Sequence, residues 1–76
     1  MNNNRRKKMK QAIKILTEAN KIIEEIASEE EESLANLPDS LQDSEMAEKL
    51  NENIIDMEEA ASNLEEAIGC LETIIE

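Results

Sequence analysis

The sequence has 76 residues, a net charge of −11 and no Phe, Tyr or Trp among its 39% hydrophobic residues. This length allows one domain, but a single chain of this size buries too little apolar surface to be comfortably stable alone. One cysteine and no histidine exclude a disulfide framework and the common zinc sites, so oligomerisation is the expected source of further stability.

The composition predicts an all-α chain, since it has one Gly and one Pro and is dominated by Glu, Lys, Ala, Leu and Ile. No apolar run approaches the roughly 20 residues needed to cross a bilayer. The basic N-terminus is not followed by the apolar core of a signal peptide. We therefore expect a cytoplasmic protein that does not bind membranes and in which Cys70 stays reduced.

The first predicted element is a helix over about residues 4–35, with the asparagines at positions 2–4 supplying its start. Apolar residues recur along it at alternating spacings of three and four. This predicted seam consists of Met9, Ala12, Leu16, Ala19, Ile23 and Ile26. Further isoleucines flank it and widen the apolar face beyond the narrow stripe of a two-stranded coil.

A turn is predicted over about residues 36–43, because Pro38 restricts Leu37 and ends the first helix. The cap of the next helix is supplied by one of four residues, Asp39, Ser40, Asp43 or Ser44. A turn this short makes the two helices antiparallel neighbours.

The second helix is predicted over about residues 44–75 and carries the most regular pattern in the chain. Its seam consists of Leu50, Ile54, Met57, Ala61, Leu64, Ile68, Leu71 and Ile75. A second apolar row beside the seam consists of Ala60, Ala67 and Ile74. We therefore expect one helical-hairpin domain over residues 1–76. Its uncovered rows favour assembly into a homo-oligomeric helical bundle, most simply a four-helix bundle of two hairpins, with higher oligomers as the alternative.

Charge is divided along the chain: residues 1–21 hold seven basic side chains against one acid, and the rest holds one lysine against 18 acids. In an antiparallel hairpin the basic start of the first helix meets the acidic end of the second. Two interpretations stay open. The two ends neutralise each other across the pair, or Arg5, Arg6 and Lys8 clamp the phosphate or carboxylate groups of an anionic ligand.

The acidic stretch before the turn also has two interpretations. Glu30 and Ser33 fall where the seam needs apolar residues, which indicates a hydrated helix end or a polar pocket near the turn. That pocket would be lined by Glu30, Ser33, Ser40, Gln42 and Ser44. Acidic side chains at helical spacing can also imitate a phosphate backbone, and the protein would then block a basic partner rather than bind nucleic acid directly.

No catalytic constellation is found. Without histidine the single Cys70 lacks its usual base, and no serine has a triad partner. The carboxylate sites of four-helix proteins use Glu-x-x-His pairs, which cannot occur here. We therefore expect a protein that is not an enzyme and uses no metal or cofactor, with Cys70 filling helical surface beside Gly69.

The turn Asn36–Glu45, set between Arg5-Arg6-Lys7-Lys8 and a downstream Leu-Glu-Glu-Ala repeat, resembles a group of short acidic helical-hairpin proteins carried by phages and prophages. In that group the segment after the turn is rich in arginine and glycine, whereas Met46 and Ala47 follow Glu45 here. The resemblance implies a setting rather than a reaction. Small helical phage proteins commonly counter host defence, by sequestering a nucleotide signal inside an oligomer or by blocking a defence protein.

The preferred hypothesis is therefore a phage-type binding protein of the host cytosol that sequesters a small anionic ligand, such as a cyclic nucleotide, between copies of itself. The residues assigned to the ligand are Arg5, Arg6, Lys8, Ser40, Gln42 and Ser44. The alternatives are an acidic interaction protein, or nucleic-acid mimic, that blocks a basic host defence or DNA-binding protein, and a structural bundle module with no ligand.

Overall fold

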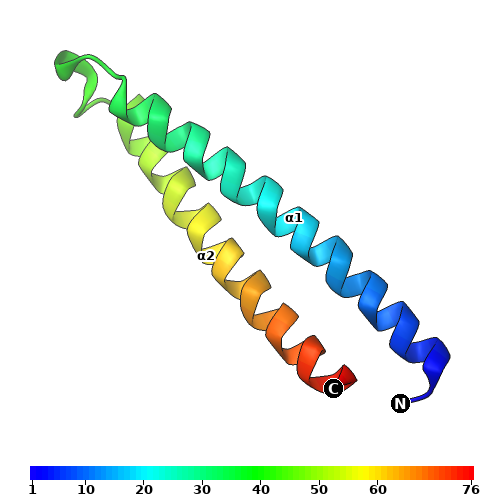
Figure 1. Ribbon diagram of the computed structural model, residues 1–76. Helices are drawn as coiled ribbons and strands as arrows, with labels where there is room; N and C mark the ends of the chain where they lie inside the picture. Colours follow the sequence, from blue (N-terminus) through cyan, green and yellow to red (C-terminus); the bar gives the residue numbers. More distant parts are fainter.

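The computed structural model describes all of residues 1–76 and is an antiparallel hairpin of two long helices (Figure 1). Helix α1 spans Asn3–Ala35, a short 3-10 helix η1 spans Asp39–Leu41, and α2 spans Glu45–Ile75. The sequence placed the long helices at about 4–35 and 44–75. The molecule is a rod with extents of 59 × 14 × 14 Å. Its two termini lie together at one end and the turn lies at the other (Figure 1).

Local sequence sets the helix boundaries. The side chain of Asn2 accepts a hydrogen bond from the backbone N–H of Arg5 at 2.8 Å, which caps α1. Pro38 follows the end of α1 and leads into η1. Of the four candidate caps for the second helix, Ser44 is the one used, because its hydroxyl accepts from the N–H of Ala47 at 3.2 Å. Neither helix has a stretch long and apolar enough to span a membrane.

The seam of α2 is the one that the sequence predicts. Every residue of that predicted seam is buried or half-buried, and Ala47 extends the pattern by one step toward the turn. The second row of α2, formed by Ala60, Ala67 and Ile74, is exposed as expected. The all-α hairpin, the coarse part of the fold prediction, is therefore confirmed.

The predicted seam of α1 is correct in part. Five of its six residues are half-buried, but Ile26 is 42% exposed. The most buried residues of α1, Asn20 and Ala27, belong to a neighbouring series that the prediction did not choose. That series consists of Arg6, Met9, Ile13, Leu16, Asn20, Ile23, Ala27, Glu30 and Leu34, all buried or half-buried. The apolar face of α1 is wide enough to hold two overlapping series, and α2 is centred on the second of them.

The core of the hairpin is thin. Only five of the 76 residues are buried, and the apolar ones are Ala27, Ala47, Ile54 and Ala61. The fifth is Asn20, which sits in the middle of the α1 seam. Because three of the four apolar core residues are alanines, this hairpin removes little hydrocarbon from water and gains correspondingly little stability from burial.

Candidate functional site

The two groups of predicted ligand residues lie at opposite ends of the rod. Arg5, Arg6 and Lys8 are in the first turns of α1, at the open end of the hairpin. Ser40, Gln42 and Ser44 are in the turn. About 29 residues of helix separate Arg5 from Leu34, which corresponds to roughly 44 Å. One hairpin therefore does not bring the two groups together.

At the open end, Arg6 has a structural role that sequence reasoning missed. Its guanidinium donates a hydrogen bond to the carbonyl oxygen of Ile75 at 2.6 Å. That carbonyl belongs to the last turn of α2, where backbone oxygens have no partner within the helix. Half-buried Arg6 thus joins the start of α1 to the end of α2. Exposed Arg5 and Lys8 are left to face solvent.

Arg5 and Lys8 border a shallow apolar hollow in the first turns of α1, next to seam residue Met9. The hollow is lined by Met1, Arg5, Lys8, Met9 and Ala12. It combines hydrocarbon surface with two cations, which is the chemistry that a ligand with an apolar ring and anionic groups would need.

In the turn, two of the three predicted ligand residues are engaged in the fold. The side-chain amide of Gln42 donates to the carbonyl oxygens of Leu37 at 2.8 Å and Leu34 at 3.3 Å. The hydroxyl of Ser44 donates to the carbonyl of Leu41 at 2.6 Å while it caps α2. Ser40 is exposed in η1.

The polar pocket predicted near the turn does not form from the expected residues. The hollow found there is lined by Leu34, Gln42, Asp43, Ala47, Glu48 and Asn51, so Gln42 is the one shared member. Glu30 is half-buried in the seam and Ser33 is exposed. The turn polarity that suggested a pocket is used instead to tie η1 and α2 to the end of α1.

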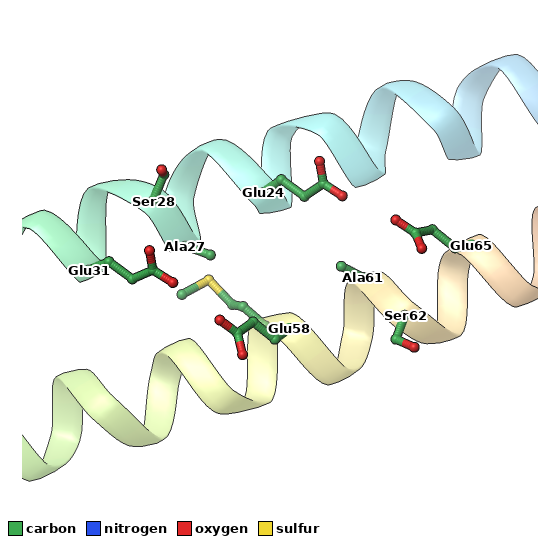
Figure 2. A pocket seen from close by; sticks show the side chains of 9 residues that line it. Glu24, Ala27, Ser28, Glu31, Glu58, Ala61, Ser62 and Glu65 are labelled. Carbon is green, nitrogen blue, oxygen red and sulfur yellow. The ribbon is translucent and has the colours of Figure 1, made fainter.

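One long side of the hairpin, here called the acidic edge, consists of Glu24, Glu31, Glu58 and Glu65. These four side chains border a hollow in the middle of the rod, where small Ala27 and Ala61 leave space between the helices (Figure 2). Each glutamate lies four residues after a seam residue of its own helix. No three acidic side chains are arranged to hold a metal ion.

The opposite side, here called the apolar edge, has several of the most exposed large hydrophobic side chains. Its apolar residues on α1 are Ile15, Ile22 and Ile26 with the half-buried Ala12 and Ala19. On α2 they are Met46, Ala60, Ala67 and Ile74, and the same row of α2 also holds Lys49, Asn53, Asp56, Asn63 and Cys70. In an antiparallel pair of helices, the residues that lie four positions after each seam residue are on the same side of the hairpin, as the acidic edge shows. The residues that lie one position before each seam residue are therefore on the opposite side of the hairpin. Ile15, Ile22 and Met46 are 58%, 56% and 60% exposed.

Asn20 is the second feature that sequence reasoning missed. Its side chain is 8% exposed at the centre of the seam, and its Oδ1 atom is buried without a hydrogen-bond partner. Its Nδ2 atom donates to Glu24 at 3.4 Å. The signal that would have revealed it is the alternative phase of the α1 seam, in which Asn20 is the one amide between Leu16 and Ile23.

No protein-family model, curated protein or solved structure matches this chain.

Proposed function

We propose that this chain is a non-enzymatic binding protein that works as a homo-oligomer and sequesters a small anionic ligand between its copies. The observation that carries the proposal is the apolar edge, because three large isoleucines exposed on the same side of α1 mark an interaction surface. The predicted ligand residues lie at the two ends of one rod, so a ligand that touches both groups would have to be held between copies.

The contacts assigned to the ligand follow from which side chains are free. Arg5 and Lys8 face solvent beside the apolar hollow, and Ser40 is exposed in the turn. Arg6, Gln42 and Ser44 shape the two ends through their hydrogen bonds to the backbone. A nucleotide signal, with the flat face of its base and its anionic phosphates, fits the hollow and its two cations.

The setting proposed for this activity is the cytosol of a phage-infected host. The resemblance of the turn and its flanking segments to short phage proteins supports it, since such proteins counter host defence by binding. Sequestration lowers the concentration of a free immune signal without any chemical step, in keeping with a chain that has no histidine.

The test is calorimetric titration of the oligomer with cyclic dinucleotides, cyclic trinucleotides and cyclic ADP-ribose isomers. We expect heat with at least one ligand, and at least tenfold weaker binding in the double variant Arg5→Gln, Lys8→Gln. The matched control is Lys7→Gln, Lys14→Gln, which removes the same charge from exposed positions of the same helix. No heat with any ligand, or equal losses in both variants, would reject the proposal.

The acidic edge supports a second candidate, an acidic interaction protein that blocks a basic host protein. Four glutamates converge there on a hollow that has no basic lining residue. Binding of that kind weakens steeply as salt rises. Pull-down from host lysate at low and high salt would detect it. Glu58→Gln with Glu65→Gln should then reduce capture, while Arg5→Gln with Lys8→Gln should not.

A further inference from the structure

The apolar edge continues along α1 as a stripe whose two ends carry opposite charge. Its residues are Arg5, Lys8, Ala12, Ile15, Ala19, Ile22, Ile26, Glu29 and Ser33, at spacings that alternate between three and four. This alternation is the one that a helix presents to another helix packed along it. The stripe is separate from the seam that faces α2. A second helix is therefore expected to lie along it, over about 32 Å from Lys8 to Glu29.

We propose that the occupant of the apolar edge is a second copy of this chain, docked antiparallel, with α1 against α1 and α2 against α2. The inference rests on the proposed homo-oligomer and adds its direction and surface, but it does not depend on any ligand. In this arrangement Lys8 of one copy meets Glu29 of its partner, and this pairing occurs twice. The basic and acidic ends of the stripe complement each other only when the two stripes run in opposite directions.

The distribution of charge over the whole rod favours the same direction. The half with the termini, residues 1–19 and 61–76, holds six basic and five acidic side chains, a net charge of +1. The half with the turn, residues 20–60, holds two basic and 14 acidic side chains, a net charge of −12. Parallel docking would place the two strongly acidic halves against each other. Antiparallel docking places each of them against a nearly neutral half.

The shape of the edge also suits a two-fold axis across its middle. Ala19 lies at the midpoint of α1, with larger isoleucines on both sides of it. On α2 the level of Ala19 falls between Ala60 and Ala67, with Asn63 of the same row between them, because Arg6 meets Ile75 at the open end of the hairpin. Small side chains at the centre let the helices of the two copies approach closely.

Antiparallel docking also completes the proposed ligand site. It brings the open end of one copy, where Arg5 lies beyond the contact between Lys8 and Glu29, next to the turn of its partner, where Ser40 is exposed. The site is incomplete in one hairpin, since the two groups are then at opposite ends of a rod 59 Å long. A dimer of this kind has two equivalent composite sites.

Cysteine cross-linking tests the direction of docking. The full chain is prepared with Cys70→Ser and with one new cysteine, as Ala19→Cys, Lys8→Cys, Glu29→Cys or the control Lys14→Cys, which lies on an exposed part of α1 outside the stripe. A short bismaleimide should convert most of the Ala19→Cys protein to twice the chain mass of 8.6 kDa. Lys8→Cys and Glu29→Cys should give this product only when mixed with each other. Lys14→Cys should give none.

The opposite pattern would overturn the inference. Parallel docking would cross-link Lys8→Cys and Glu29→Cys each with itself and not with each other. Absence of any cross-link, with circular dichroism showing an intact helical fold, would mean that the stripe faces no second copy. Because cross-linking needs no ligand, the two proposals fail separately. If the cross-links are parallel but titration with nucleotide still gives heat, only the proposed docking direction is wrong. If the cross-links are antiparallel but titration gives no heat, only the proposed sequestration is wrong.

Discussion

The two long edges of the hairpin differ in what they present to solvent. The acidic edge brings together four glutamates, two from each helix, around a hollow above Ala27 and Ala61 (Figure 2). The apolar edge presents alanines and isoleucines along the middle of α1, and a methionine, two alanines and an isoleucine between more polar residues of α2. Like charges gathered on one edge keep copies apart there, whereas exposed hydrocarbon on the other favours association. The contrast is why we propose the apolar edge, and not the acidic edge, as the surface between copies.

The largest effect is expected from a substitution that separates the two helices, because both edges are built from residues of α1 and α2. Ile54 is 6% exposed in the α2 seam, whereas its neighbour Ile55 is 54% exposed. Ile54→Asp should abolish most of the helical circular-dichroism signal, since an unpaired carboxylate in the core costs several kcal/mol. Ile55→Asp is the matched control and should change stability by only about 0.5 kcal/mol. Equal effects of the two changes would mean that the core lies elsewhere.

Placing a charge on the apolar edge should remove association and leave the hairpin itself intact. Ile22→Glu buries two carboxylates per symmetric dimer, so we expect the dissociation constant to rise about 100-fold or more. Light scattering after size-exclusion chromatography measures the mass directly. Thr17→Glu adds the same charge at an exposed position on the other side of the α1 seam and should leave the mass unchanged. An oligomer that survives Ile22→Glu would show that the apolar edge is not the interface.

The buried amide of Asn20, in the seam between the two edges, should lower the stability of the hairpin while restricting how the helices assemble. Asn20→Leu removes an unpartnered buried oxygen and adds apolar contact, so the free energy of unfolding should rise by about 1–3 kcal/mol. A single buried asparagine in a helical seam also fixes register and copy number. Urea unfolding and native mass spectrometry should therefore show a more stable protein with a broader range of assemblies. A loss of stability would indicate that the oxygen has a hydrogen-bond partner in the assembled protein.

At the open end, substitutions of the adjacent residues Arg5 and Arg6 should differ in their effect on stability. Arg6→Met removes the hydrogen bond to Ile75 and should lower stability by about 1–2 kcal/mol, measured as a shift of the urea midpoint. Arg5→Met should leave stability nearly unchanged, because Arg5 is exposed. In ligand titrations Arg5→Met should have the larger effect. Similar destabilisation by both changes would mean that the hydrogen bond of Arg6 does not stabilise the hairpin.

The smallest expected effect concerns the surface that belongs to neither edge. A methyl group added at Gly69 has nothing within 4 Å, and Gly69 lies in the interior of α2. Gly69→Ala should therefore raise stability by about 0.5–1 kcal/mol in thermal unfolding, with no change of mass. If the substitution instead reduced the mass of the assembly, a partner copy would have to approach this surface.

The hairpin and the seam of α2 could be predicted because one regular series of apolar residues leaves a single choice of face. The centre of the α1 seam could not, since Ala12, Ala19 and Ile26 in one series and Ile13 and Ala27 in the other make the two almost equally apolar. Only the packing against α2 decides which of them is covered more deeply. For the same reason Asn20 was missed, because it occupies the series that was not chosen. Among the candidate ligand residues, sequence could identify their charge and position. It could not show that Arg6, Gln42 and Ser44 already bond to backbone carbonyls.

The most direct test of the central claim is sedimentation equilibrium of the unmodified protein at micromolar concentration. Since one hairpin leaves its apolar edge in water, we expect a mass of at least twice 8.6 kDa. Dilution should lower this mass, and helical structure or stability should be lost at the same time. A well-folded particle of 8.6 kDa, equally stable at all concentrations, would contradict the claim that a second copy covers this edge.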